Sequence, residues 1–295
     1  RAQVLEGVDV SSTTILITGT TTGIGTATIK ALAIAGAHVV QLNRSEELSK
    51  KQREEIVFQQ PSARIDFVKC DLASLASVRR AASEVLDRGW PIHAIICNAG
   101  VFASTQKTTE DGLEMTFGVN HVGHFHLIQL LTRRMRQSAP ARIVIVSSEG
   151  HAHSGLSASR SLEEKLSSIC PDASSTASSF SLYCTSKLCN VLFAKRLHRI
   201  ENTNGVDVYV LHPGAFIDTG LSRGLGIWGR ILNFVTSPFT KSLSQGAATS
   251  VYCAVHPDCA GLSGRYWDSC WDDEKRLKRE LACDERLQDA LWTRT

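Results

Sequence analysis

The chain has no strong excess of positive or negative charge. It contains 32 Lys and Arg residues against 29 Asp and Glu residues, which gives a formal net charge of +3 over 295 residues. No block of Lys and Arg stands out as a stripe that could follow a phosphate backbone. We therefore expect no nucleic-acid partner.

Long apolar runs are also missing. The longest candidate, residues 225–239, is interrupted by two glycines, Arg230 and Pro238, whereas a spanning helix needs about 20 consecutive apolar residues. We therefore predict no transmembrane span. The chain starts with Arg1 and lacks the apolar core of a signal peptide. Because the first residue is not Met, we also expect that the chain is a piece of a longer protein.

Paired cysteines and clusters of metal ligands are absent too. The nine cysteines are odd in number, scattered, and include no CxxC pair. This pattern is typical of reduced thiols, so we predict a cytoplasmic protein. The histidines close to the predicted site, at positions 121, 124, 126, 151 and 153, lack the spacing of metal ligands. We expect no metal.

What the sequence does contain is a regular order of apolar segments. Hydrophobic residues make up 43% of the chain and charged residues 21%, which allows a sizeable core. Short β-branched runs alternate with segments of helical spacing. The runs predict strands at residues 15–18, 38–42, 65–70, 92–97, 142–147 and 206–211, and helices at 23–35, 46–59, after Ser74, at 113–136 and at 182–199.

This alternation predicts the fold. Strands that are apolar throughout and separated by helices indicate a parallel sheet that is covered on both faces. We predict a doubly wound, three-layer α/β/α fold. The length suits one such domain and would be cramped for two, so we assign residues 1–295 to a single domain.

Two stretches interrupt the rhythm. Residues 154–181 hold eleven serines, and residues 215–240 combine Gly, Trp and Phe with weak periodicity. Long excursions in a compact domain are often lids, but disordered insertions have a similar composition. We predict that residues 215–240 form a substrate lid and leave the Ser-rich insert open. The apolar lid residues also fit core packing or an oligomer contact; they are Leu225, Ile227, Trp228, Ile231, Leu232 and Phe234.

A glycine-rich turn joins the first predicted strand to the first predicted helix. Glycines there let the backbone approach a pyrophosphate, and the helix N-terminus supplies unpaired N–H groups and partial positive charge. Any tight strand-to-helix turn needs glycine, so the motif gains weight only from its place in a strand–turn–helix unit. The predicted cofactor-binding residues of this turn are Gly19, Thr22, Gly23, Ile24 and Gly25.

The end of the second predicted strand indicates which dinucleotide binds. NAD-selective sites usually carry a carboxylate there, which would repel a 2′-phosphate. This chain has Asn43 and Arg44 instead, and a guanidinium matches a phosphate dianion. We therefore predict NADP(H), with the alternative that Arg44 is an ordinary solvated residue. Further cofactor contacts are expected from Asp71 and Leu72 after the third strand and from Asn98, Ala99 and Gly100 after the fourth.

Tyr183 and Lys187 lie four residues apart and so share one face of a predicted helix. A tyrosine has a pKa near ~10 in solution and is a poor base at neutral pH. A nearby ammonium and a positive nicotinamide ring would stabilise the phenolate, so the pair predicts a tyrosine acid–base. Lys187 could also hold the ribose hydroxyls. Without accompanying residues, the same spacing is typical of a surface pair.

Two polar residues accompany this pair. Ser148 follows the fifth strand, where its hydroxyl could donate to a carbonyl oxygen; the adjacent Ser147 is the alternative. Asn120 stands in a long apolar helix. It could order a water that relays protons to Lys187, or it could bond to the backbone as a helix-packing residue.

His212, Pro213 and Gly214 follow the sixth predicted strand. The proline and glycine would end this strand sharply and expose backbone groups to the nicotinamide amide. His212 could be a second base, but a buried structural histidine is the simpler interpretation.

Together these motifs resemble the short-chain dehydrogenase/reductase family over nearly the whole chain. The resemblance implies a Rossmann-like domain, a nicotinamide cofactor and a catalytic tetrad of Asn120, Ser148, Tyr183 and Lys187. Asp218 stands where the family usually has a hydroxyl residue after its PG motif, which leaves Thr219 as the expected contact. The matching segments are TGTTTGIG from Thr18, CNAG from Cys97, VNHVGHF from Val119, VSS ending at Ser148, YCTSK from Tyr183 and HPG from His212.

Some segments resemble particular branches of the family. YCTSKLCNVLF is similar to the retinol dehydrogenase group, whereas DGLEMTFGVNHVGHF and PFTKSLSQGAATSVYCAV are closer to a branch in which two small proline-motif-binding modules precede the reductase domain. Those modules are not in this sequence, which agrees with a truncated start or with a divergent form that lacks them. No basic residue occupies positions 20–22, where many NADP-preferring members carry one.

The resemblance and the apolar lid imply interconversion of a carbonyl and an alcohol on a small lipophilic substrate, such as a steroid or retinoid. A cofactor-binding scaffold that acts through protein partners, with vestigial turnover, is the alternative from a different class. A nucleotide-sugar epimerase or dehydratase is a third option, against which the short region after Leu211 counts. Relatives often pair through the helices around Asn120 and Tyr183, which leaves a homodimer open.

Overall fold

The computed structural model describes residues 2–214, 242–272 and 274–295. Seven parallel strands form one sheet in the order β3-β2-β1-β4-β5-β6-β7. The strand order reverses between β1 and β4, and ligands of such sheets bind outside the carboxyl ends of the strands at this point. The strands are β1 Thr14–Thr18, β2 His38–Asn43, β3 Arg64–Lys69, β4 Ala94–Cys97, β5 Ala141–Val146, β6 Val206–His212 and β7 Tyr266–Asp268.

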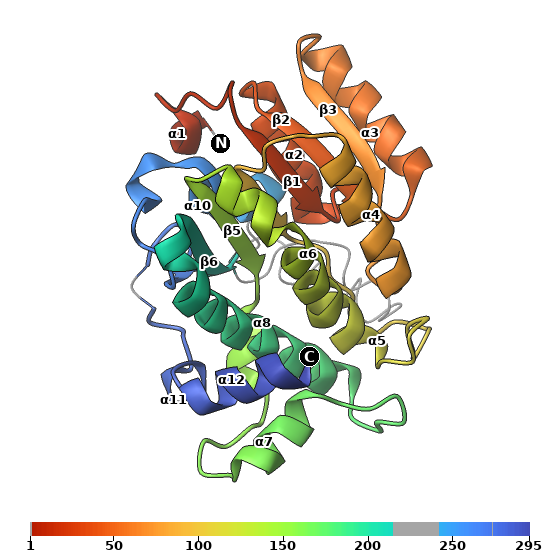
Figure 1. Ribbon diagram of the computed structural model, residues 1–295, viewed down its shortest axis with the longest axis vertical. Coiled ribbons are helices and arrows are strands. Elements are labelled where there is room, and N and C mark those ends of the chain that lie inside the picture. Colours follow the sequence, from red (N-terminus) through yellow and green to blue (C-terminus); the bar gives the residue numbers. More distant parts are fainter. Residues whose placement is uncertain (1, 215–241, 273) are drawn as a thin grey trace.

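Helices cover both faces of the sheet (Figure 1). Helices α4, α6 and α8 contribute to one apolar cluster, which includes Leu127 and Val191. Helices α2, α3 and α10 contribute to a second cluster, which includes Ile29 and Val251. The protein therefore has the three-layer, Rossmann-like α/β/α fold predicted from the sequence. The helices are α1 Ala2–Leu5, α2 Gly23–Ile34, α3 Glu46–Gln59, α4 Leu75–Asp87, α5 Met115–Phe117, α6 Gly123–Gln137, α7 Leu162–Ile169, α8 Ser179–Glu201, α10 Leu243–Val255, α11 Arg279–Ala282 and α12 Glu285–Arg294, with 3-10 turns at Glu149–His153, Asn202–Asn204 and Pro257–Cys259.

Most of the predicted elements are present. Each of the six strands predicted from apolar runs lies within two residues of its predicted bounds. The predicted cap of α4 is confirmed, because the Ser74 side chain accepts a hydrogen bond from the Ser77 N–H. The sequence does not predict β7, since a three-residue strand leaves no periodic signal. It lies at the edge of the sheet, where Asp268 is in register with His212 of β6.

The single long helix predicted at residues 113–136 is wrong. Helix α5 ends at Phe117, a π-helical turn spans Gly118–Val122, and α6 begins at Gly123. The Gly123 N–H donates to the Gly118 carbonyl oxygen five residues earlier. Hydrophobic periodicity cannot resolve one extra residue in a helical turn. Such turns are frequent at functional sites, and this one contains Asn120.

The Ser-rich insert is ordered and partly helical. Its helix α7 begins with a capping box between Ser161 and Glu164. Leu166 and Ile169 of α7 are buried in an apolar cluster shared with α8. The insert is therefore a helical extension of the domain beside α8.

The C-terminal helix α12 covers the outer side of α6 and α8. The Trp292 ring lies 5.0 Å from that of Phe125 on α6 and 5.9 Å from that of Phe193 on α8, measured between centroids. Arg196 of α8 forms an ion pair with Asp289 at 2.9 Å. A homodimer through α6 and α8, left open by the sequence, would need α12 to move or to take part in the contact.

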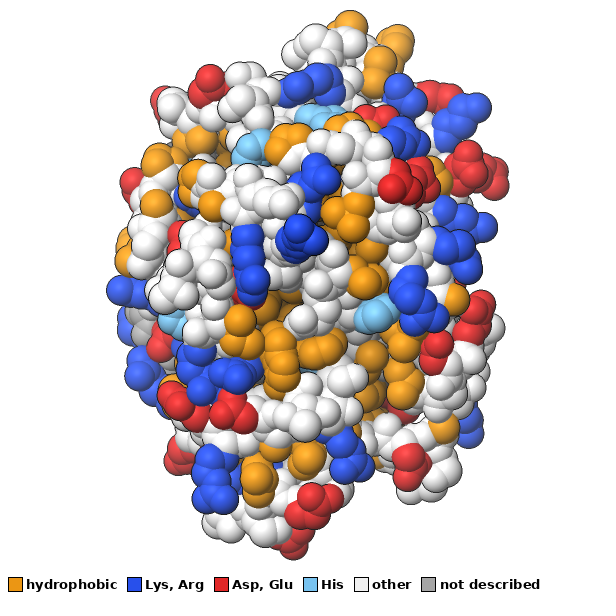
Figure 2. All heavy atoms as spheres, viewed as in Figure 1, with side chains coloured by type: hydrophobic (Ala, Val, Ile, Leu, Met, Phe, Trp, Pro, Cys, Tyr) orange, Lys and Arg blue, Asp and Glu red, His pale blue; other side chains and the backbone are white. Residues whose placement is uncertain are grey.

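Figure 2 shows the same face of the molecule with Lys, Arg, Asp and Glu side chains intermixed around apolar side chains near its middle. No helix within the described ranges is both long and apolar enough to span a bilayer. The predicted lid at 215–240 lies outside the described residues.

Candidate active site

A cavity of about 770 Å³ lies at the carboxyl edge of the sheet. Three of the four predicted catalytic residues line it, whereas Asn120 does not. Thr219 lies outside the described residues. The other predicted cofactor residues all line the cavity: Gly19, Thr22, Gly23, Ile24, Gly25, Arg44, Asp71, Leu72, Asn98, Ala99, Gly100, Tyr183, Lys187, Pro213 and Gly214.

The glycine turn between β1 and α2 leaves no room for side chains. A Cβ atom on Gly25 would lie 2.1 Å from the carbonyl oxygen of Gly19. Gly19 has a φ of +68°, in the left-handed region that favours glycine. Asn98 fixes the turn, because its side-chain amide donates to the Thr18 and Gly19 carbonyl oxygens at 3.0 and 2.9 Å. The Asn98 side chain therefore holds the shape of the glycine turn.

The N-terminus of α2 is uncapped where it meets the cavity. Thr22 is the N-cap residue, and its side chain makes no capping hydrogen bond. By contrast, Ser45 and Ser74 cap α3 and α4 through their side chains. Thr22 and Gly23 both line the cavity. Free N–H groups and the helix dipole favour an anion at this position, which fits the pyrophosphate of a dinucleotide.

Arg44 is exposed at the end of β2 and lines the cavity. The preceding Asn43 is buried, and its Oδ1 accepts from the Thr20 N–H at 2.9 Å while its Nδ2 donates to the Thr20 hydroxyl at 2.7 Å. The Thr20 side chain therefore faces a buried polar network. Over the part of the chain that the structure describes, Arg44 is the only arginine in the cavity wall and Asp71 the only carboxylate.

Asp71 follows β3 and lines the same cavity as Arg44. Its Oδ1 accepts a hydrogen bond from the Ala73 N–H at 2.9 Å, and its own N–H donates to the Ser77 hydroxyl at 3.0 Å. These two bonds fix the carboxylate in the wall, where it can accept a hydrogen bond from an adenine amino group.

Tyr183 and Lys187 lie one turn apart on α8, and both line the cavity. The Lys187 Nζ lies 5.6 Å from the centroid of the Tyr183 ring and donates to the Val146 carbonyl oxygen at 3.0 Å. Burial lowers the pKa of Lys187 to about 8. Burial also raises the pKa of Tyr183, and a hydrogen bond with Ser148 opposes that rise. In the protein itself, burial therefore dominates the pKa of Tyr183. The lowering expected from the sequence involves the positive nicotinamide ring as well as the ammonium.

The two serines after β5 point in different directions. Ser147 is buried, and its hydroxyl donates to the Lys187 carbonyl oxygen at 2.8 Å. Ser148 lines the cavity together with Tyr183 and acts to lower the pKa of its phenol, and the Ser148 Oγ accepts from the Gly150 N–H at 3.1 Å. The structure thus brings Ser148 to the phenol, while Ser147 holds the backbone of α8.

Asn120 lies behind the cavity and is fully buried. Its Oδ1 accepts from the Val101 N–H at 2.7 Å, and its Nδ2 donates to the Val101 carbonyl oxygen at 3.1 Å and to Ser186 at 3.0 Å. A Cβ atom on Gly100 would lie 3.4 Å from Asn120 Oδ1 and 3.5 Å from Lys187 Nζ. The amide thus bonds to the backbone, as the helix-packing interpretation expects, and fixes the segment after β4 beside Lys187.

His124 is a buried residue of the site that the sequence interpretation missed. Its Nε2 lies 2.8 Å from the Thr18 hydroxyl, and its Nδ1 lies 3.1 Å from the Asn120 carbonyl oxygen. Burial lowers its pKa to about 4, so the ring is neutral, with Nδ1–H donating and Nε2 accepting. The ring joins the end of β1 to the π-helical turn. The spacing of Asn120 and His124 in VNHVGHF was the available signal.

Phe102 was missed as well. Its ring packs edge-on against the Tyr183 ring, with 5.4 Å between centroids. Because it follows the CNAG segment in an irregular loop, no periodicity marks it. It forms an apolar wall of the cavity together with Val101, Met115 and Val119.

His212 ends β6 and is buried beside the segment that follows Ser148. Its Nδ1 accepts a hydrogen bond from the Glu149 N–H at 3.1 Å. This contact joins the end of β6 to that segment, which agrees with a structural histidine. Among the described residues, no group of three or more His, Cys, Asp and Glu side chains is arranged to hold a metal ion.

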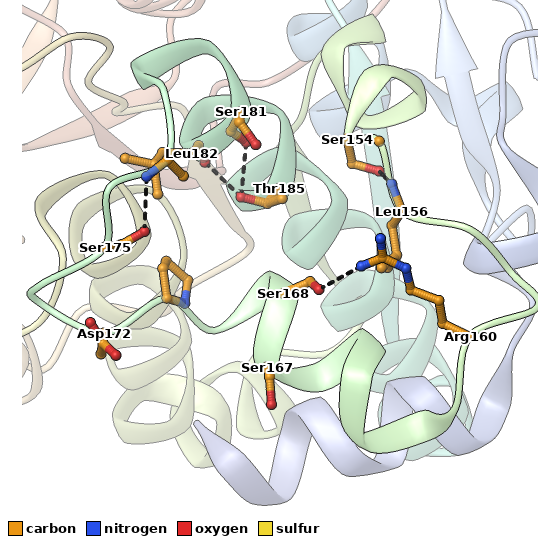
Figure 3. Close-up of a pocket in the computed structure, with 13 residues that line it drawn as sticks. Ser154, Leu156, Arg160, Ser167, Ser168, Asp172, Ser175, Ser181, Leu182 and Thr185 are labelled. Carbon is orange, nitrogen blue, oxygen red and sulfur yellow. Dashed lines mark hydrogen bonds between the residues drawn. The ribbon is translucent and has the colours of Figure 1, made fainter.

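A second cavity, of about 480 Å³, lies between the Ser-rich insert and the first turns of α8 (Figure 3). Arg160 points toward Ser168 in its wall, with 3.4 Å between Nη1 and Oγ. The Thr185 hydroxyl donates within α8, to the Ser181 and Leu182 carbonyl oxygens. None of the predicted site residues lines this cavity, so it is separate from the glycine turn and the Tyr183 site.

Comparison with known proteins decides the family. A family model described as short chain dehydrogenase matches residues 13–159. The WW domain-containing oxidoreductase of Gallus gallus is 39% identical over 290 residues, which cover 98% of this chain and 69% of that protein. The chain belongs to the short-chain dehydrogenase/reductase family. Retinol dehydrogenase 14 of Mus musculus is 40% identical over 294 residues, covering 95% of this chain and 83% of that protein. As a member of this family, the chain is an oxidoreductase that uses a nicotinamide cofactor.

Solved structures agree with the fold of a short-chain dehydrogenase/reductase. A protein from Mycobacterium paratuberculosis superimposes with a TM-score of 0.69 at 25% identity, covering 98% of this chain and 94% of that one. A blue fluorescent protein from a metagenomic library, solved in complex with NADPH, gives a TM-score of 0.68 at 22% identity and covers 88% of this chain and 97% of that one. Both branches of the family indicated by sequence segments are thus confirmed as relatives.

Proposed function

We propose that this chain is an NADP(H)-dependent oxidoreductase that interconverts a carbonyl and an alcohol, with Tyr183 as the acid–base. The main support is that one cavity is lined by the uncapped start of α2, by Arg44 and by the pair Ser148 and Tyr183. Such a reaction requires an anion site for the pyrophosphate, a cation for the 2′-phosphate and hydroxyl groups that can donate to the carbonyl oxygen.

Arg44 supports NADP(H) over NAD(H). It lines the cavity beyond the end of β2, where NAD-selective sites carry a carboxylate. Position 20, where many NADP-preferring relatives carry a second basic residue, is a threonine in this chain. Thr20 forms hydrogen bonds with the buried Asn43 side chain. The 2′-phosphate would therefore be bound chiefly by this guanidinium.

The chemistry follows from the protonation states in the site. When bound, the nicotinamide cofactor would deliver a hydride to the carbonyl carbon or, in the reverse direction, take one from the alcohol carbon. In the reducing direction, Tyr183 donates its phenolic proton to the carbonyl oxygen, and burial keeps the phenol protonated for this step. Because Ser148 Oγ already accepts from the Gly150 N–H, its own O–H can donate to the same oxygen and stabilise negative charge there. Lys187, whose Nζ donates to the Val146 carbonyl oxygen, would also hold the ribose hydroxyls.

The substrate class is the finer part of the proposal. Phe102 packs against the Tyr183 ring, and two further apolar residues, Met115 and Val119, line the same cavity. Retinol dehydrogenase 14 of Mus musculus is a relative at 40% identity. Both observations favour a small lipophilic carbonyl or alcohol, such as a steroid or retinoid.

To test the proposal, the protein is titrated with NADPH and with NADH, and binding is measured by nicotinamide fluorescence. The cofactor that binds more tightly is then offered with a panel of lipophilic ketones and aldehydes. We expect tighter binding of NADPH and its oxidation with at least one member of the panel. Tight NADPH binding without turnover on any carbonyl would support the alternative function, a cofactor-binding scaffold for protein partners.

A further inference from the structure

His151 links the segment after Ser148 to the C-terminal part of the chain. It is fully buried in the 3-10 turn that begins directly after Ser148. Its Nδ1 lies 2.7 Å from the Ser148 carbonyl oxygen, and its Nε2 accepts from the Lys278 N–H at 3.2 Å. Since a carbonyl only accepts and an amide N–H only donates, the ring must be neutral with its proton on Nδ1.

Two further contacts join the same parts of the chain. We name residues 274–279 the C-terminal strap. Arg276 Nη1 donates to Glu149 Oε2 at 2.9 Å, and Lys278 Nζ donates to the Leu156 carbonyl oxygen at 3.1 Å. The strap therefore contacts the chain after Ser148 at three successive points, and the imidazole contact lies between the other two.

The strap is itself anchored to the domain. Glu274 accepts hydrogen bonds from Lys195 Nζ of α8 at 2.8 Å and from the Tyr266 N–H of β7 at 3.1 Å. Its φ of +54° is in the left-handed region, where a glutamate is strained unless its surroundings hold it. The Tyr266 ring also packs against the His151 ring, with 5.0 Å between centroids. Movement of the strap would therefore disturb contacts on both α8 and the sheet.

We propose that His151 is a positioning residue for Ser148 and that the C-terminal strap holds its imidazole in the required orientation. The inference rests on the catalytic role proposed for Ser148. Three hydrogen bonds from the following turn fix this serine. Its carbonyl oxygen accepts from the His151 ring and from the His151 backbone N–H, and its Oγ accepts from the Gly150 N–H. A Cβ atom on Gly150 would lie 3.5 Å from Tyr183 Cε1, so the turn also packs closely against the phenol.

The charge state of His151 suits this role. Burial lowers its pKa, and this outweighs the opposing effects of the hydrogen bond to Ser148 and of the Glu149 carboxylate. A protonated ring would present an N–H to the Lys278 N–H and lose that bond. The neutral ring instead donates on one side and accepts on the other.

Two substitutions of His151 each keep one of the two hydrogen bonds of its ring, to the Ser148 carbonyl oxygen or to the Lys278 N–H, and remove the other. His151→Asn places an amide nitrogen near the position of Nδ1 and can still donate to Ser148. His151→Gln places an amide oxygen near the position of Nε2 and can still accept from Lys278. We expect kcat to fall about tenfold in the Gln variant and about threefold in the Asn variant, with the NADPH Kd unchanged. Wild-type kcat in both variants, or a loss confined to the NADPH Kd, overturns the proposal.

A double-mutant cycle shows whether the effect passes through Ser148. His151→Gln is combined with Ser148→Ala, and residual turnover is measured on the carbonyl that the wild-type protein reduces. If His151 acts by positioning Ser148, its substitution changes kcat by less than about twofold in the Ser148→Ala background. A full loss in both backgrounds places the effect of His151 elsewhere and contradicts the proposal.

Amide hydrogen exchange tests the strap without turnover. The Lys278 N–H should exchange faster in the Asn variant than in the Gln variant or the wild-type protein, because Asn alone removes its acceptor. Equal protection in all three proteins overturns the strap contact. If the wild-type protein binds NADPH but reduces no carbonyl, the proposed function fails, and this exchange measurement still decides whether the strap holds His151.

Discussion

Ser148 and Tyr183 line the wall of one cavity, and Ser148 acts to lower the pKa of the phenol, although 35 positions separate the two residues in the chain. They come together because β5 ends beside α8, where Ser147 donates to the Lys187 carbonyl oxygen at 2.8 Å. Two consecutive serines thus have separate tasks. Ser148 lies in the cavity wall with the phenol, and Ser147 fixes the helix that carries the phenol.

Substitution of the two serines should separate these tasks. We expect Ser148→Ala to lower kcat about 100-fold, because a positioned donor to the developing negative charge is lost. Ser147→Ala should instead lower the free energy of unfolding by about 1 kcal/mol, since it removes one buried hydrogen bond. Steady-state kinetics and denaturant unfolding of both variants provide the comparison. Equal losses of kcat would contradict the assignment.

The pH dependence of turnover should reflect Lys187. Burial lowers its pKa to about 8, from 10.5 in the unfolded chain, so its positive charge is lost as the pH rises through about 8. We expect kcat/KM to fall over that range. In Lys187→Arg the charge persists, and this pH step should vanish even if the rate is low. A step that remains in the Arg variant must come from another group.

The same shift has a consequence for stability. Between pH 8 and 10.5 the unfolded chain binds more protons at this lysine than the folded protein does. The contribution of Lys187 to the free energy of unfolding should therefore rise with pH across this window. Urea unfolding of the wild-type protein and of Lys187→Met at several pH values measures this contribution as a difference.

Arg44→Ala tests the choice of cofactor. Loss of a charge-assisted contact to the 2′-phosphate should raise the NADPH Kd about 10- to 100-fold and leave the NADH Kd nearly unchanged. Arg53→Ala is the matched control, because Arg53 is an exposed arginine of the neighbouring helix α3 and does not line the cavity. If Arg44→Ala weakens the binding of NADPH and NADH equally, the guanidinium does not bind the 2′-phosphate.

Trp292→Ala tests the packing of α12 on α6 and α8. The ring contacts Phe125 and Phe193, so its removal should lower the free energy of unfolding by about 2 kcal/mol, less than for a fully buried aromatic residue. Trp271 is 72% exposed, and Trp271→Ala should stay within about 0.5 kcal/mol of the wild-type protein. Similar effects of the two substitutions would mean that α12 contributes little to the domain.

The sequence predicts the sheet well because most of its strands are buried on both faces. A run such as that of β5 is apolar at successive positions, and a glycine turn or a Ser cap marks where a helix begins. β7 and the π-helical turn at Gly118–Val122 leave no such signal. The helix α7 is hidden for another reason, because its serines resemble those of a disordered segment.

Site residues that the backbone conformation requires, such as glycines, can be predicted from the sequence. Site residues whose roles depend on packing against distant parts of the chain cannot. Gly25 is recognisable because a close approach of two chain segments requires glycine. The roles of Phe102 and His124 depend on partners 81 and 106 positions away, Tyr183 and Thr18, which no local pattern identifies. Burial of the Tyr183 phenol, which raises its pKa in the protein itself, is likewise a property of the folded chain.

The most direct test is NADPH oxidation by the wild-type protein and by Tyr183→Phe, with a carbonyl that the wild-type protein reduces. Tyr252→Phe is the control, as a tyrosine of α10 that does not line the cavity. We expect Tyr183→Phe to bind NADPH normally and to lose turnover by a factor of about 100 to 10,000, the usual contribution of a general acid, while Tyr252→Phe retains wild-type rates. Turnover by Tyr183→Phe at the wild-type rate would show that another group supplies the proton.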